Sequence, residues 1–257
     1  MQIGVCTAPE NFTDAVDGIE FIEPSVANIL CPAEDDAAFE QRLAAAKACP
    51  APVEAVNCLI PGSMRSTGED IDGVALDKWI DTVLNRAAAI GVKRIVYGSG
   101  GSRRVPDEFD HRRATSQIIG HLQRWGPMAK PLGITFVLEP LNQGECNIVN
   151  TVDEGADIVR HVNHPNVQLL IDTFHMALDG DPPEAIRRAG ELVCHAHCAE
   201  ADGRGFIGVK GEDHRPYFRA LKDIGYAGRM SIEAKWTDFA AELPAAVEEL
   251  KKQIESA

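Results

Sequence analysis

The sequence predicts one (β/α)8 barrel, in which eight parallel strands alternate with eight helices. Short β-branched or Leu-rich runs alternate with amphipathic stretches along the whole chain. No change of composition and no low-complexity linker divides the chain, and its 257 residues suit a single large α/β domain, here residues 1–257. An open doubly wound sheet, which also alternates strands and helices, is the alternative architecture.

Each predicted strand is an apolar run followed by a stretch with helical character. The strands are expected at Ile3–Cys6, Ile19–Glu23, Val53–Leu59, Arg94–Gly98, Ile134–Glu139, Val167–Asp172, Leu192–Cys198 and Met230–Ala234. The helices are expected near Thr13–Val16 and at Asp36–Cys49, Ile71–Ile90, Asp107–Lys130, Val152–Asn163, Pro183–Arg188, His214–Ile224 and Asp238–Ile254. Thr151 and Glu154 form a capping-box pattern, and Gly91, Gly133 and Gly225 are expected to end helices.

The composition excludes some classes of partner. The formal charge of −14 and a pI near 5.0 argue against a nucleic-acid backbone. No apolar run approaches 18 residues, so no membrane span or membrane partner is expected. The first residues read as a strand without a basic region, so we expect no signal peptide. Seven cysteines, an odd number, include several in strand-like runs, which favours a reducing, cytoplasmic location.

Four consecutive predicted strands end in a residue that can bind a divalent metal. These are Glu139, Asp172, His197 and Glu233, spaced about 25 to 36 residues apart. Any one of them alone is explained as a helix cap or a polar residue at the barrel rim. Four in succession at the repeat length of a β-α unit predict ligands that converge on one end of the barrel. Three carboxylates and one imidazole favour one Mn²⁺ ion, with Mg²⁺, Co²⁺ and Zn²⁺ as alternatives.

The motifs around these residues resemble those of a known family. The runs are Glu139-Pro-Leu-Asn-Gln-Gly-Glu145, Asp172-Thr-Phe-His175-Met, His195-Ala-His197-Cys-Ala-Glu200, Gly225-Tyr-Ala-Gly and Ser231-Ile-Glu233. They resemble the sugar phosphate isomerase/epimerase family that includes D-tagatose 3-epimerase, within the xylose isomerase-like TIM-barrel superfamily. The similarity is specific from about residue 134 to 235 and loose before that.

The resemblance implies roles for individual residues. The four strand-end residues would be the metal ligands, and Glu145, His175 and a downstream arginine would contact the hydroxyls and carbonyl of a sugar. Arg204 is the candidate for this arginine, but it lies seven residues after His197, where the family usually has it six after. The first two strands end at Cys6 and Glu23, without the aromatic side chains that wall the sugar pocket in the family.

The residue types indicate proton transfer at a carbon next to a carbonyl. A metal that binds the carbonyl and hydroxyl oxygens of a ketose acidifies the α C–H by stabilising an enediolate. Glu139 and Glu233, three strands apart, are then the catalytic residues, one removing a proton from one face and the other returning a proton to the opposite face. The sequence therefore predicts a metal-dependent sugar or sugar-phosphate isomerase or epimerase.

A glycine-rich stretch after the fourth strand carries two arginines, Arg103 and Arg104. Its glycine spacing does not fit a dinucleotide-binding fingerprint. The two guanidinium groups are expected to bind an anionic part of the substrate, such as a phosphate or carboxylate. Loop salt bridges or contacts across a dimer interface are the alternatives.

Other functions on the same barrel stay open from the sequence. A lyase or dehydratase acting on a keto-sugar or an inosose would use the same acidified α C–H and then expel a β substituent. An endonuclease IV-like repair enzyme is a remote alternative, because its three zinc ions need further histidines at strand ends and a basic groove. A sugar-binding protein without activity is the non-enzymatic alternative. The expected partner is a sugar or sugar-derived small molecule, anionic or not. Relatives often form dimers or tetramers, so a homo-oligomer is one option, and the sequence leaves the oligomeric state open.

Overall fold

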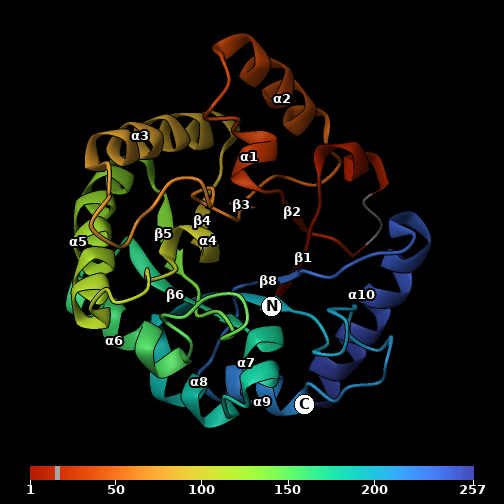
Figure 1. The fold of residues 1–257 in the computed structure, drawn as a ribbon. Coiled ribbons are helices and arrows are strands. Elements are labelled where there is room, and N and C mark those ends of the chain that lie inside the picture. Colours follow the sequence, from red (N-terminus) through yellow and green to blue (C-terminus); the bar gives the residue numbers. More distant parts are fainter. Residues whose placement is uncertain (15–17) are drawn as a thin grey trace.

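The structure is a computed structural model, and it describes residues 1–14 and 18–257. Eight parallel strands lie side by side in the order β2-β1-β8-β7-β6-β5-β4-β3, and helices surround them (Figure 1). Two parallel bridges, Ile22 to Val53 and Ser25 to Asn57, join β2 to the segment around β3. These bridges bring the two ends of the sheet together, so the predicted (β/α)8 barrel is confirmed.

The strands lie close to their predicted positions. Their bounds are β1 Gln2–Cys6, β2 Phe21–Glu23, β3 Ala55–Val56, β4 Arg94–Tyr97, β5 Thr135–Leu138, β6 Val167–Asp172, β7 Val193–Cys198 and β8 Arg229–Ile232. The prediction of a seven-residue third strand was wrong, because β3 has two residues. The regular pairing of β3 with β4 ends at Val56, and only single backbone bonds to the neighbouring segments continue: the N–H of Asn57 donates to the carbonyl of Pro24, and that of Leu59 donates to the carbonyl of Val96.

The predicted strict alternation of eight strands and eight helices was wrong. The helices that correspond to predicted ones are α2 Asp36–Ala48, α3 Gly73–Ile90, α5 His111–Ala129, α6 Val152–Val162, α8 Pro183–Ala189, α9 Arg215–Asp223 and α10 Phe239–Ser256. Three short helices were missed: α1 Val26–Ile29, α4 Gly100–Arg103 and α7 Thr173–Asp179. Short 3-10 helices cover η1 Pro9–Asp14, η2 Lys130–Leu132 and η3 Gly190–Leu192. The helix expected near Thr13–Val16 lies partly at residues 15–17, outside the described residues.

The predicted helix ends are confirmed. The Thr151 side chain accepts a hydrogen bond from the backbone of Glu154, whose carboxylate accepts one from the backbone of Thr151, as a capping box requires. Gly91, Gly133 and Gly225 all have positive φ, the left-handed conformation that ends a helix. These local signals therefore fix where the chain turns back towards the next strand.

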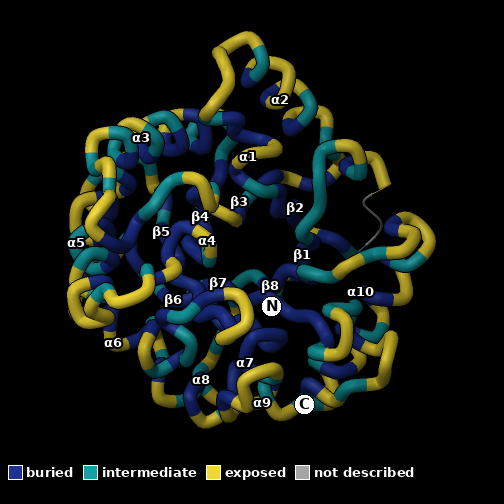
Figure 2. The backbone as a smooth tube through the Cα atoms, in the orientation of Figure 1, coloured by how far each residue is buried: buried dark blue, intermediate teal, exposed yellow. Residues whose placement is uncertain are grey.

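The inside of the barrel is separate from the larger core that lies between strands and helices. Val96, Val137 and Leu170, from three neighbouring strands, form a small buried cluster of their own. Successive side chains of a strand point to opposite faces. Glu139 therefore follows Val137 on the same inward face, and Asp172 follows Leu170. Figure 2 shows the buried strands within a ring of helices whose outer surfaces are exposed.

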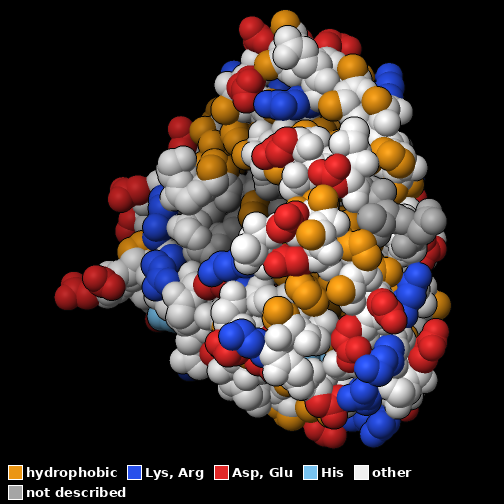
Figure 3. All heavy atoms as spheres, turned by 90° about the vertical axis from the view of Figure 1, so that its right-hand side faces the viewer, with side chains coloured by type: hydrophobic (Ala, Val, Ile, Leu, Met, Phe, Trp, Pro, Cys, Tyr) orange, Lys and Arg blue, Asp and Glu red, His pale blue; other side chains and the backbone are white. Residues whose placement is uncertain are grey.

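Among the described residues, no helix combines the length and the apolar character that crossing a bilayer requires. On the face drawn in Figure 3, lysine and arginine side chains are interspersed with aspartates and glutamates. This face carries no continuous basic stripe of the kind that tracks a nucleic-acid backbone.

Candidate active site at the carboxyl ends of the strands

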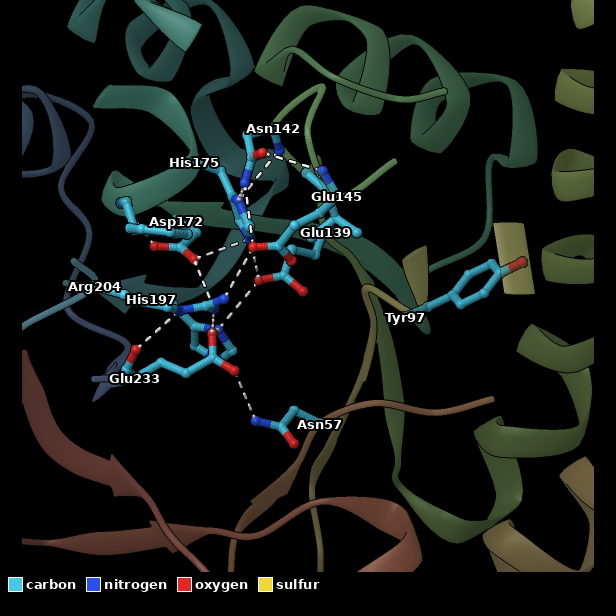
Figure 4. Close-up of polar contacts among 12 residues, drawn as sticks. Asn57, Tyr97, Glu139, Asn142, Glu145, Asp172, His175, His197, Arg204 and Glu233 are labelled. Atoms are coloured by element: carbon cyan, nitrogen blue, oxygen red, sulfur yellow. Dashed lines mark hydrogen bonds and ion pairs between the residues drawn. The ribbon is translucent and has the colours of Figure 1, made fainter. Parts of the chain in front are cut away.

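The structure brings the four predicted ligands together at the end of the barrel. Glu139, Asp172, His197 and Glu233 each offer one ligand atom, and these atoms all lie within 4.8 Å of one another (Figure 4). His197 Nδ1 is 3.3 Å from Glu139 Oε1 and 3.1 Å from Glu233 Oε2. Each residue lies at or directly after a strand end, and the carboxyl ends of parallel strands lie together at one end of the barrel.

Two oxygens of this group lack a hydrogen-bond donor. Glu139 Oε1 and Asp172 Oδ2 are buried and accept no hydrogen bond. Burial raises the pKa of Asp172, and the nearby Glu139 and Glu233 add to the rise, against His175 and Arg204. Burying carboxylates without partners is costly unless a cation compensates them. Three carboxylates, one imidazole and two orphaned oxygens therefore fit a divalent metal ion, and the site can hold one.

The remaining ring nitrogen of His197 contacts a residue that the sequence did not single out as functional. His197 Nε2 lies 2.8 Å from Oε1 of Glu23, which is fully buried at the end of β2. Burial opposes the ionisation of Glu23, but His197 and His195 hold its pKa far below its usual value. In return, Glu23 and Glu233 raise the pKa of His197 well above its ordinary value, against the effect of burial.

Glu233 is held from both sides. Asn57 Nδ2, from the segment after β3, donates to Glu233 Oε1 at 3.1 Å, and Arg204 Nη2 lies 2.6 Å from Oε2. Burial would raise the pKa of Glu233, but His197 and Arg204 lower it to about 2. The carboxylate is therefore ionised at neutral pH and fixed in orientation.

His175, on the short helix α7, lies at the edge of the cluster. Its Nε2 is 3.4 Å from Asp172 Oδ2 and 4.0 Å from Glu139 Oε1. Its Nδ1 accepts from the backbone of Asn142 at 3.2 Å and lies 2.7 Å from the Asn142 side-chain amide. Because Nδ1 accepts, the ring proton is on Nε2, which faces the carboxylates.

Arg204 reaches the cluster although it lies one residue further along than the family usually has it. Its guanidinium bonds Glu233 and, at 3.2 Å, Glu145 Oε1, and it lies over the ring of Phe174 at 4.3 Å. Gly203 and Arg204 both have positive φ, of 78° and 58°. The chain therefore turns through the left-handed conformation at both residues, which is strained at the arginine.

The loop that carries Arg204 is built around Glu200. This carboxylate is fully buried and accepts hydrogen bonds from four backbone N–H groups of residues 208, 210, 211 and 212, at 2.7 to 3.1 Å. The backbone of Glu200 also bonds Gly205, and the carbonyl of Arg204 accepts from Lys235. One buried side chain thereby fixes a loop that would otherwise have few backbone partners.

A cavity of about 420 Å³ opens beside the cluster. Its walls include Glu139, Glu145, His175, Arg204 and Glu233, together with residues that follow β2, β3 and β4: Ser25, Ala27, Cys58, Ile60, Pro61, Gly62, Ser99, Gly100 and Gly101, with Trp79 of α3. Trp79 is the one aromatic residue among the described lining residues, in keeping with the missing aromatic walls noted in the sequence. A Cβ at Gly98, directly after β4, would overlap Glu139 Oε2, so the glycine lets the Glu139 carboxylate keep its present position.

Comparison with known proteins decides the family. A family model described as Xylose isomerase-like TIM barrel matches residues 15–256. The chain belongs to this family. It is 39% identical over 129 residues to a D-psicose 3-epimerase of Ruminiclostridium cellulolyticum, covering 49% of this chain and 43% of that protein. It is 38% identical over 136 residues to a D-psicose 3-epimerase of Agrobacterium fabrum, covering 51% and 44%.

The matches span less than half the length of these two curated relatives. Among solved structures, the D-allulose 3-epimerase from Methylomonas sp. in complex with D-allulose aligns with a TM-score of 0.82, 21% identity and coverage of 98% of this chain and 97% of that chain. At this identity the alignment shows a shared fold, which agrees with the family assignment.

Two residues predicted to bind the substrate, Arg103 and Arg104, do not line the cavity beside the cluster. Arg103 is fully buried, donates from Nη1 to the carbonyl of Tyr97 and lies over the Tyr97 ring at 5.4 Å. Tyr97 itself lies apart from the cluster (Figure 4). Arg104 is exposed and donates to the carbonyls of Gly144 and Glu145. The structure therefore does not bring this pair to the cavity, because the short helix α4 turns Arg103 into the core.

Three contributors to the site were missed as functional residues. Glu23, Asn57 and Glu200 contact ligands or hold a loop, and each lies at or just after a strand end. The signal for Glu23 and Glu200 was a charged residue at the end of an apolar run, the same signal that pointed to the predicted ligands. Asn57 carried no such signal. It lay inside the predicted third strand, whereas in the structure β3 ends one residue before it.

Proposed function

We propose that this family member is a divalent-metal-dependent ketose 3-epimerase. The observation that carries the proposal is the convergence of Glu139 and Glu233, from β5 and β8, on one cluster with Asp172 and His197. Relatives named D-psicose 3-epimerase and L-ribulose 3-epimerase support the class of reaction, since each matches about half of the chain.

Glu139, Asp172, His197 and Glu233 would hold the ion. We infer Mn²⁺, because three carboxylate oxygens and one imidazole form a mostly hard donor set. When bound, the ion supplies stabilisation of the negative charge that develops on the carbonyl oxygen as the neighbouring carbon loses its proton. The two orphaned oxygens of Glu139 and Asp172 support this assignment.

Glu139 and Glu233 would move the protons. Both line the cavity, and they reach it from strands separated by β6 and β7. One glutamate takes a proton from C3 of the ketose, and the electron pair passes to the C2 carbonyl as an enediolate. The other glutamate, which must enter the step carrying a proton, returns it to the opposite face of C3, which inverts that centre and exchanges the protonation states of the two carboxyl groups. A lyase would share the first step and lose a substituent instead of regaining a proton.

His175, Glu145 and Arg204 would bind the sugar. His175 presents Nε2–H to the cluster, and Glu145 and Arg204 lie at the cavity wall with polar atoms facing it. Arg204 is the one cation among the described lining residues, and three carboxylates already surround it. A phosphate would meet these carboxylates, so we favour an unphosphorylated ketose over the sugar phosphate that the sequence left open.

We also infer a reducing, cytoplasmic location, because all seven cysteines are free thiols. The absence of nucleic-acid and membrane partners stays a prediction from the sequence, and the oligomeric state stays open.

The test is an assay of metal-loaded protein with D-psicose, D-tagatose and L-ribulose, and with their phosphates. We expect epimerisation at C3 of at least one free ketose, lost after chelation and restored by Mn²⁺. Conversion of none of these ketoses by protein shown to contain the ion would contradict the proposal. Release of water with formation of a dehydrated product would identify the lyase instead.

A further inference from the structure

Glu23, to which the proposed reaction assigns no role, lies at the centre of a buried polar group. Its carboxylate contacts His197 Nε2 at 2.8 Å, His195 Nε2 at 2.7 Å and Ser231 Oγ at 2.5 Å. All four side chains are fully buried, and they come from β2, β7 and β8. We call these four residues the Glu23 hub.

The hub determines which nitrogen of His197 keeps its proton when the other nitrogen binds an ion. An ionised carboxylate has only lone pairs to offer, so each of its three neighbours must donate. The proton on His197 Nε2 is thereby fixed. Nδ1, the other ring nitrogen, points to Glu139 Oε1 and Glu233 Oε2 at 3.3 and 3.1 Å.

The hub also determines which edge of the His197 imidazole ring points to the cluster. Rotation of the imidazole by 180° would exchange each nitrogen with a carbon, so that carbon would face Glu139 and Glu233. Only the present orientation satisfies Glu23 and places a nitrogen among the carboxylates. His195 and Ser231 both donate to the second oxygen of Glu23, and they prevent the carboxylate from turning away.

We propose that Glu23 is a positioning residue for the metal site, holding His197 so that Nδ1 is the nitrogen presented to the ion. This inference rests on the proposed function, since it assumes that the cluster binds a divalent metal. Carboxylates that orient a ligating histidine in this way contribute to metal affinity. Cys6 lies close enough to Glu23 and His197 to suggest a second ion, but the three donors already occupy both oxygens of Glu23.

The test compares metal binding by the full-length protein and three variants, after chelation and dialysis. Titration calorimetry with Mn²⁺ should show that Glu23→Leu weakens binding about 10- to 100-fold. Glu23→Gln keeps an oxygen that accepts from His197, so it should bind within about fivefold of wild type. Ser231→Ala removes a donor to the same carboxylate but leaves the bond to His197, and it should also lose less than about fivefold.

A spectroscopic measurement separates positioning from a general loss of structure. Proton NMR of the wild-type protein loaded with Co²⁺ should show an exchangeable, paramagnetically shifted imidazole N–H, from His197 Nε2. This signal should persist in Glu23→Gln, and it decides the matter even if Glu23→Leu does not fold. Its absence in Co²⁺-loaded wild type would overturn the inference, as would unchanged Mn²⁺ affinity in folded Glu23→Leu. Failure of the wild type to bind any metal would instead contradict the proposed function itself.

Discussion

The two halves of the barrel contribute to the site in different ways. Strands β5 to β8 end in the four residues that form the cluster, whereas β1 to β4 supply none of them. The first half contributes Glu23, Asn57 and Gly98, which respectively hold His197, hold Glu233 and leave room for Glu139. The second half therefore carries the groups proposed to react, and the first half contacts them and fixes where they lie.

The same comparison indicates where the substrate is recognised. Much of the cavity wall comes from the first half, and several of its polar groups are already engaged there. Ser99 Oγ accepts from the backbone of Ile60, and Trp79 Nε1 donates to the carbonyl of Leu59. This wall can shape a sugar but offers it few new hydrogen bonds. Most of the polar recognition would fall to residues of the second half.

The largest expected effect is in the second half, at Glu139. Glu139→Gln removes a charged ligand and a proton-transfer group together, so ketose epimerisation should fall by about 10³-fold or more. Initial rates with Mn²⁺ in excess measure this loss. Glu145→Gln, a matched change at the cavity wall, should leave Mn²⁺ binding intact and raise KM. Retained epimerisation in Glu139→Gln would show that the reactive groups lie elsewhere.

The next largest effect is expected at Gly98 in the first half, where the substitution adds volume and leaves the charge unchanged. A Cβ at Gly98 would overlap Glu139 Oε2, so Gly98→Ala should displace this ligand and weaken Mn²⁺ binding about tenfold or more. Gly62→Ala is the matched control in the same wall, because the nearest atom to its Cβ would be 3.6 Å away. Calorimetry on both variants measures the difference. Equal affinities would mean that the first half does not constrain Glu139.

Glu200 tests whether the second half depends on its own supporting loop. Glu200→Gln replaces a carboxylate that accepts four backbone N–H groups, so it should lower the free energy of unfolding by about 2 kcal/mol. KM for the ketose should rise, because Arg204 loses its fixed position. Urea unfolding and steady-state kinetics measure the two effects. The exposed Glu255→Gln is the control, and a stability loss as large as that of Glu200→Gln would contradict the account.

The smallest effect is expected at Asn57 in the first half. Asn57→Ala removes one hydrogen bond to Glu233, so kcat should fall about fivefold while the metal stays bound. Asn85→Ala, on the exposed face of α3, removes an amide that bonds only within its own helix and should change nothing measurable. An unaltered kcat in Asn57→Ala would show that Glu233 needs no support from this half.

The same division explains what the sequence could predict. The four residues of the cluster could be predicted because each closes a buried strand, and parallel strands bring such residues to one end of a barrel. Arg103 was misplaced because a four-residue helix carries too little local pattern to reveal that it turns inward. Glu23 was visible as a strand end, but its role depends on a contact with His197 that spans 174 residues. Contacts at such separations follow from packing, which local patterns do not encode.

The central claim is that four strand-end residues hold an ion that permits proton exchange at C3 of a ketose. The most direct test incubates the Mn²⁺-loaded protein in D₂O with D-psicose, D-tagatose and L-ribulose, and follows deuterium by mass spectrometry and NMR. The account predicts deuterium at C3 of the epimeric product of at least one ketose, abolished by chelation and restored by Mn²⁺. An epimer that carries no solvent deuterium, or exchange that continues unchanged after the metal is removed, would contradict it.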